Sequence, residues 1–188
     1  MPREIFAHLN TKSWTALCAV VWLGFLATSA TAQSPLLPQK QTPRPETTNG
    51  VPHVQIGITP DPKLSQALLK VVAEFPGVQL GPTRVSLPGA VGFQLLDEVS
   101  LAQPEAIVGG REFAHLHPDG SLHASLDPPV AQQAISRGWA VAHPWATRRR
   151  GWEGFVMIYT PNNQTELKTV IQLVKESYGF VTGQMLPN

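Results

Sequence analysis

The turn from His117 to Gly120 (HPDG) is the feature that most restricts how this chain can fold. Proline presets the second position of a type I turn, and glycine tolerates the positive φ that a three-residue hairpin loop with a bulge requires. The flanking residues then pair as antiparallel strands, with His115 opposite His123 and His117 opposite Ser121. The segment therefore predicts a β-hairpin.

The register of this hairpin decides where its histidines point. Side chains alternate along a strand, so the predicted pairing brings His115, His117 and His123 to one face, with opposed Cβ atoms about 5 Å apart. A two-residue loop would instead pair His123 with Ala114 and turn it to the other face. The three-histidine face is therefore a prediction about register.

Three imidazoles on one face have three interpretations. On rigid strands they suit a divalent metal ion with an open coordination position. They also suit a site that binds an anionic or phenolic group and moves protons near neutral pH. The third interpretation is a polar cross-strand cluster held by structural hydrogen bonds.

A further histidine lies among tryptophans. His143, between Trp139 and Trp145, is the expected fourth member of the site. Trp145 and Trp152 are predicted to wall a pocket for a flat aromatic ligand. Trp139 directly follows the end of a predicted helix and is expected in the core. His53, beside a proline-rich segment, is left outside the predicted site.

The N-terminus has the layout of a secretory signal peptide. Arg3 and Lys12 form a basic start, the run from Trp14 to Ala27 is apolar, and an Ala-x-Ala motif ends at Ala32. The apolar run is shorter than the about 20 residues of a membrane-spanning helix. We expect cleavage after Ala32, export to the periplasm or the medium, and no stable membrane anchor afterwards. An uncleaved N-terminal anchor is the alternative.

Cleavage would change the composition of the chain. Cys18, the only cysteine, would be removed, leaving no disulfide, thiol nucleophile or thiolate ligand. Loss of Arg3, Lys12 and Glu4 leaves 12 basic and 12 acidic residues. A neutral chain is not expected to bind nucleic acid. The basic run Arg148–Arg150 is expected to be a solvated loop.

Residues 33–60 are rich in proline and poor in large apolar side chains. Such a segment buries too little surface to offset its ordering entropy, which predicts a linker. We divide the chain into a signal peptide (1–32), a proline-rich linker (33–50) and a single domain (51–188).

The domain is predicted to be α+β. Capping residues and apolar faces indicate three helices, and short apolar runs between turns indicate strands. The helices are predicted to begin at Asp61-Pro62, Asp127-Pro128 and Asn163, and the strands to lie at 78–96, in the hairpin and at 153–159. This order favours a mostly antiparallel sheet with three packed helices.

Residues between 111 and 182 also keep the order and spacing of a known family. They are Arg111-Glu112, Ala114-His115, His117, Leu122-His123, Leu126, Gly138-Trp139, His143-Pro144, Tyr159, Pro161, Asn163, Glu166, Ser177, Gly179 and Thr182. On these residues the chain resembles the luciferase-domain family, whose characterised members are the fungal luciferases. All four histidines of the expected site fall on matching positions.

The resemblance implies an enzyme that oxidises a hydroxylated pyrone-type aromatic with molecular oxygen, releasing carbon dioxide and light, without an organic cofactor. We expect oxidation of a small phenolic or enolic aromatic, and no light. The turn after His117 is shorter than in those luciferases, which also look membrane-anchored where this chain looks exported.

The expected roles are these. The expected catalytic residues are His115, His117, His123 and His143. The expected substrate-binding residues are Arg111, Glu112, Trp145, Trp152 and Tyr159. The alternative is a non-catalytic module that binds a small molecule, or a divalent metal through His115, His117 and His123.

Overall fold

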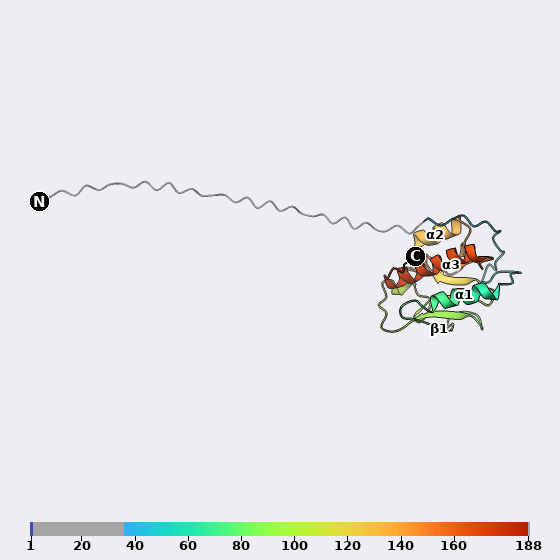
Figure 1. Ribbon diagram of the computed structural model, residues 1–188, viewed down its shortest axis with the longest axis horizontal. Coiled ribbons are helices and arrows are strands. Elements are labelled where there is room, and N and C mark those ends of the chain that lie inside the picture. The colour runs from blue at the N-terminus through green and yellow to red at the C-terminus, as the bar shows by residue number, and fades with distance from the viewer. Residues whose placement is uncertain (2–35, 188) are drawn as a thin grey trace. The chain divides into compact units, whose positions relative to one another are not determined.

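The computed structural model describes residues 36–187, together with Met1, and residues 36–187 belong to one compact unit (Figure 1). The elements in chain order are α1 (Pro62–Val72), β1 (Val78–Pro82), β2 (Val91–Leu95), the 3₁₀ turn η1 (Pro104–Ala106), β3 (Glu112–Leu116), β4 (Leu122–Ser125), α2 (Pro128–Ser136), β5 (Ala140–Ala142), β6 (Phe155–Ile158) and α3 (Gln164–Thr182). The strands form one sheet in the order β1-β2-β3-β4-β6-β5, and every neighbouring pair is antiparallel. The predicted α+β class is confirmed.

The predicted signal peptide lies outside the described residues. Within the described part of the chain, no helix combines the length and the apolarity that a membrane crossing requires.

The long helices begin where their caps predict. Asp61 Oδ1 accepts a hydrogen bond from the Lys63 N–H at 2.9 Å, and proline occupies the first position of α1. Asn163 Oδ1 accepts from the Glu166 N–H at 2.9 Å at the start of α3. α3 ends at Gly183, whose φ of +75° gives the left-handed C-cap that glycine favours.

α3 covers one face of the sheet and packs on β3 and β4, while α1 packs beside α3. The side chains that meet there are almost fully buried: Ala114, Leu116, Leu122 and Ala124 from the strands, and Val170, Val174 and Tyr178 from α3. Burial of this apolar face removes it from water and is the main stabilising contribution to such a layer. It also turns the alternate side chains of β3 and β4 to the opposite face.

The hairpin has the predicted register. His115 pairs with His123 across β3 and β4, and the His117 N–H donates to the Ser121 carbonyl at 2.8 Å. The Gly120 N–H donates to the His117 carbonyl at 3.0 Å, and Gly120 has a φ of +80°. The turn is therefore the three-residue loop with a left-handed glycine.

β3 contains an irregularity that the sequence did not indicate. Ala114 pairs with Phe93, but Glu112 pairs with Gln94, so Phe113 is an extra residue in the ladder. Such a bulge shifts the alternation of side chains. It brings Glu112 to the same face as His115, three residues away.

The segment before α1 is packed on the domain, unlike the linker that its composition suggested. Leu37 is 1% exposed, and the Trp139 indole N–H donates to the Pro38 carbonyl at 2.6 Å. Gln55 donates its backbone N–H to Asp119 at 3.1 Å. The segment is therefore held in place by apolar and polar contacts with residues distant in the sequence. Amino-acid composition carries no information about such contacts. The domain boundaries themselves stay predictions.

Two smaller differences concern strands. The residues of the predicted turn at Gly81-Pro82 lie within β1 instead. β1 is the edge strand of the sheet, where a proline is tolerated because one side of the strand has no neighbour to pair with. β5 was not predicted, because three residues carry too short a pattern. Trp139, directly before β5, is 3% exposed and packs in the core as expected.

Candidate histidine site

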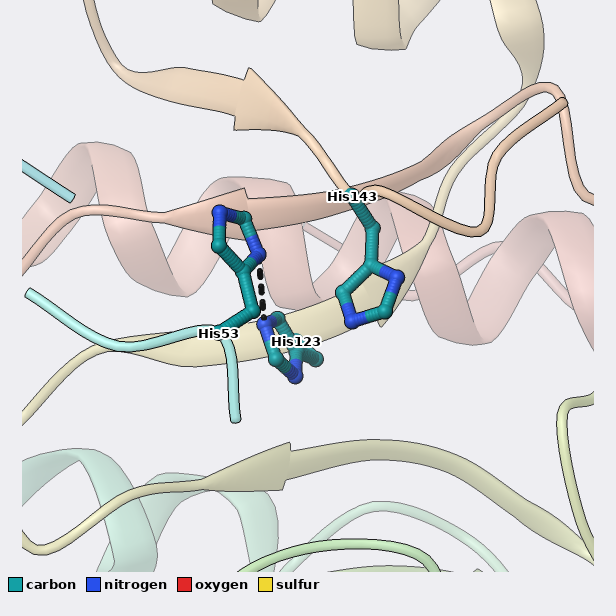
Figure 2. Close-up of side chains that lie close together, drawn as sticks. All are labelled: His53, His123 and His143. Carbon is teal, nitrogen blue, oxygen red and sulfur yellow. Dashed lines mark hydrogen bonds between the residues drawn. The ribbon is translucent and has the colours of Figure 1, made fainter. Parts of the chain in front are cut away.

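Five of the six histidines meet on the face of the sheet opposite α3; Figure 2 shows three of them. Each is at most 5% exposed: His53, His115, His117, His123 and His143. The sixth, His8, lies outside the described residues. The structure thus brings together the four predicted histidines and adds His53.

A chain of hydrogen bonds runs through this cluster. Glu112 Oε1 lies 2.8 Å from His115 Nδ1, and His115 Nε2 lies 3.1 Å from His123 Nδ1. His123 Nε2 lies 3.2 Å from His53 Nδ1, and these two rings stack with 5.3 Å between their centroids. Since a carboxylate only accepts, the Nδ1 of His115 carries the hydrogen and its Nε2 presents a lone pair to the cluster.

Glu112 is held by several donors. The Thr83 hydroxyl donates to Oε1 at 2.7 Å and the Arg84 N–H donates to Oε2 at 2.9 Å. Burial alone would raise the pKa of Glu112, but the hydrogen bonds from His115, Arg84 and Thr83 lower it below its ordinary value. Glu112 is therefore an ionised carboxylate that orients His115.

His117 is oriented in a similar way. Its Nδ1 lies 3.0 Å from Ser121 Oγ, whose hydroxyl donates to Asp119 Oδ1 at 2.7 Å. Since the serine hydrogen is engaged by Asp119, His117 Nδ1 is the donor and Nε2 carries the lone pair. That Nε2 is buried and has no hydrogen-bond partner.

His143 has the opposite tautomer. It follows β5, and its Nδ1 accepts the Trp145 backbone N–H at 3.0 Å. The hydrogen of the neutral ring is therefore on Nε2.

Burial keeps most of the cluster neutral. Loss of solvation lowers the pKa of His117 to about 4 and that of His143 to about 3. Burial also lowers the pKa of His53, and lowers that of His123 well below its ordinary value of 6.5. Positive charge on one ring would repel charge on the others. These four imidazoles are uncharged at neutral pH.

A cavity of about 220 Å³ opens beside the cluster. Its lining is His53, His115, His117, His123 and His143 together with Val51, Pro52, Val85, Ser86, Leu87, Val108, Trp145 and Phe155. One side of the cavity is therefore lined by imidazole rings, and the remaining lining residues are mostly apolar. Such a site suits a small, largely flat ligand with a polar group at one end.

Two stacked tryptophans lie on one side of the cavity. Trp145 lines the cavity and stacks on Trp152, with ring centroids 6.2 Å apart and an angle of 21° between the planes. Arg148 lies over the Trp145 ring at 5.4 Å, and Arg149 over the Trp152 ring at 5.3 Å. These exposed arginines cover the indoles by cation–π contact.

The other residues expected to bind substrate lie elsewhere. Arg111 donates to the carbonyls of Leu95 and Leu96 at 3.0 and 2.9 Å, outside the cavity lining. Tyr159 is 4% exposed and its N–H bonds to the Trp139 carbonyl, also outside the lining. Of the five residues expected to bind substrate, Trp145 alone is among the lining residues.

Sequence reasoning missed His53 because 62 residues separate it from His115. Its position depends on Gln55, which bonds to Asp119 and whose side-chain amide donates to Thr160 Oγ1 at 2.6 Å. The only local signal was the alternation of apolar residues after His53, which suggested a short strand without indicating its partner.

Two sets of histidines have the geometry of metal ligands. In each set, one nitrogen per residue lies within 4.8 Å of the others. The sets are His115, His117 and His123, and His53, His123 and His143. Buried histidines of this chain thus have an arrangement that could hold a metal ion.

Comparison with known proteins gives a consistent result. The family model described as luciferase domain matches residues 110–177. The luciferase of Armillaria gallica is 30% identical over 168 residues, which cover 79% of this chain and 62% of that protein. The luciferase of Armillaria mellea matches with the same identity and coverage. The luciferase of Neonothopanus nambi is 32% identical over 78 residues, covering 38% of this chain and 28% of that protein.

The chain spans about three fifths of the length of the Armillaria luciferases, where the match covers 62% of each. No solved structure matches it.

Proposed function

We propose that this chain, which is similar to proteins of the luciferase-domain family, is an enzyme that oxidises a small phenolic or enolic aromatic with molecular oxygen in the histidine-lined cavity. The observation that carries the proposal is that histidine and aromatic side chains line the same cavity. The histidines provide lone pairs for a hydroxyl group, and Trp145 and Phe155 provide aromatic faces.

The volume limits the substrate. A cavity of about 150 Å³ holds a benzene molecule in an apolar protein interior. The 220 Å³ here accommodates one substituted aromatic ring better than an extended ligand. The substrate of this chain is therefore proposed to be small, with its hydroxyl directed at the imidazoles.

The chemistry follows from the tautomers. His117 Nε2 has no partner and lines the cavity, so it is the natural acceptor for a substrate hydroxyl. Passage of the hydroxyl proton into the cluster leaves an electron-rich phenolate or enolate. Molecular oxygen attacks this anion at a ring or enolate carbon, and the peroxide anion formed with the new C–O bond takes the proton back to give a hydroperoxide. The ionised Glu112 beside His115 offsets the positive charge that the cluster gains. Catalysis of this kind needs no organic cofactor.

Export is part of the proposal. The predicted signal peptide, if removed after Ala32, would place the activity outside the cytoplasm. Mass determination of the chain recovered from cells and medium tests this, and an intact N-terminus would support the membrane-anchored alternative.

The decisive experiment measures oxygen consumption with a panel of hydroxylated aromatics and enols. We expect turnover without light for the wild type, a loss of about 100-fold or more for His115→Ala and His117→Ala, and no change for the exposed control Lys63→Ala. Circular dichroism shows whether each variant is folded. Binding of a phenol without oxygen consumption would support the non-catalytic binding module. The absence of both binding and turnover would contradict both functions.

A further inference from the structure

We infer that His115, His117 and His123 bind one divalent transition-metal ion, with an open coordination position facing the cavity. Binding of the ion does not require the oxidation proposed above, but a bound ion would occupy the His117 Nε2 lone pair and would meet the substrate hydroxyl in its place. Only the role of the ion as a cofactor rests on that proposed function.

The spacing of the nitrogens fits a shared ion. His115 Nε2 and His123 Nδ1 lie 3.1 Å apart. Two nitrogens that each lie at about 2.1 Å from a tetrahedral zinc ion are about 3.4 Å apart. The three hairpin histidines have ligand nitrogens within 4.8 Å of one another, so small ring rotations complete the site. Because β3 and β4 hold these rings in register, the site needs no rearrangement of the backbone.

In two of the proposed ligands, the ring nitrogen that does not face the ion has a hydrogen-bond partner, as in most metal-bound histidines. His115 Nδ1 donates to the Glu112 carboxylate at 2.8 Å, and His117 Nδ1 donates to Ser121 Oγ at 3.0 Å. Asp119 in turn accepts from Ser121. These contacts fix each ring with its Nε2 lone pair toward the cluster, which is the usual arrangement around zinc and related ions.

The unpartnered Nε2 of His117 is a second, independent observation. Buried polar atoms almost always have a partner, and this one is fully enclosed without one. A ring nitrogen with a lone pair is satisfied either by a hydrogen-bond donor or by a cation. A metal ion shared with His115 and His123 satisfies it.

The tautomers favour this set over His53, His123 and His143. The Nδ1 lone pair of His143 already accepts the Trp145 N–H, so its Nε2 carries the hydrogen and has no lone pair to offer. His53 is better placed as an outer partner. When His123 Nδ1 binds the ion, its Nε2–H donates to His53 Nδ1, at the distance of 3.2 Å already present.

The ligand chemistry limits the ion. Three neutral imidazoles, with no thiolate or carboxylate in the set, suit zinc, copper, iron, nickel or cobalt rather than magnesium or calcium. All three ligands line the cavity, so the remaining position faces the proposed substrate. An ion there would bind a hydroxyl oxygen and lower its pKa, assisting the deprotonation that the oxidation requires.

The test uses the full-length chain, carrying an affinity tag free of histidine and stripped with a chelator. Titration with Co²⁺ is followed by visible absorption, which reports ligand number, and by calorimetry. We expect one equivalent to bind the wild type, none to bind His117→Ala, and Glu112→Gln to weaken binding about 10–100-fold. His143→Ala is the matched control and should bind as the wild type does.

The outcomes separate the two proposals. Absence of Co²⁺ binding, or loss of binding in His143→Ala but not in His117→Ala, would overturn the metal site. His117→Gln, which keeps a polar side chain of similar size, replaces His117→Ala if circular dichroism shows that variant to be unfolded. Oxygen consumption by the chelator-stripped protein would keep the proposed enzyme and remove the ion from its mechanism. Metal binding without any turnover would keep the site and remove the oxidation.

Discussion

Gly92 lies directly across the sheet from His115, and a Cβ atom added to it would be 2.5 Å from Glu112 Oε2. The same Cβ would be 3.1 Å from the Thr83 Cα. The absence of a side chain at Gly92 is therefore what lets the Glu112 carboxylate reach the His115 ring.

Gly92→Ala should displace the Glu112 carboxylate and destabilise the protein by about 1–3 kcal/mol. Urea unfolding of a double-mutant cycle with Glu112→Ala measures the effect. The added methyl has more room in the Glu112→Ala background, so its cost should be smaller there. An equal cost in both backgrounds would show that Glu112 is not what restricts Gly92.

Leu37→Ala should destabilise the domain by about 2–5 kcal/mol, because it removes a fully buried side chain. Leu36→Ala is a matched control, since Leu36 is 69% exposed, and should change stability by at most about 0.5 kcal/mol. Thermal or urea unfolding compares the two. Similar small effects would mean that the segment around residue 37 does not contribute to the folded domain.

Gly154→Ala should cost about 1–3 kcal/mol or prevent folding. A Cβ on Gly154 would be 1.8 Å from the Leu126 carbonyl oxygen, and backbone atoms cannot rotate away as a side chain can. Gly50→Ala is the control, since no atom lies within 4 Å of its added Cβ. The free energy of unfolding of both variants checks this, and a neutral Gly154→Ala would be inconsistent with the close approach of Gly154 to the Leu126 carbonyl.

The buried Glu166 should contribute to acid sensitivity. Burial alone would raise its pKa, but the Asn162 N–H, the Thr42 hydroxyl and the Lys40 ammonium lower it below the ordinary value of 4.5. A carboxyl with a lowered pKa in the folded state stabilises the fold above the pKa of the unfolded chain. That contribution is lost as the pH falls through the folded pKa.

Glu166→Gln should therefore destabilise the protein by about 1.5–3 kcal/mol at pH 7, where charged hydrogen bonds are lost. The difference between wild type and Glu166→Gln should shrink as the pH falls below about 4.5 toward the folded pKa. Urea unfolding at several pH values measures it. A difference that is constant with pH would mean that ionisation of Glu166 is not stabilising.

The sequence predicted what depends on neighbours along the chain. The turn residues determined that His115 faces His123, and the caps at Asp61 and Asn163 determined where two helices begin. Local rules suffice in these cases because turn, cap and alternation are all set within a few residues.

Contacts over long separations were not predictable in the same way. Strict alternation would have put Glu112 on the face covered by α3, and only the bulge at Phe113 turns it to His115. His53 reaches the cluster through bonds that Gln55 makes with distant residues. Arg111 was expected near the substrate, but it satisfies backbone carbonyls on another part of the surface.

Some of the residues that line the cavity lie on strands, and others lie in loops. His115 and His123 lie on strands that pack against α3, whereas Val51, Val85, Leu87, Val108 and Trp145 lie in loops. A mutational library confined to those loop positions would therefore alter which molecules fit, while His115 and His123 kept their geometry. The fold offers a starting scaffold for directed evolution, in which ligand choice can be changed separately from reactivity.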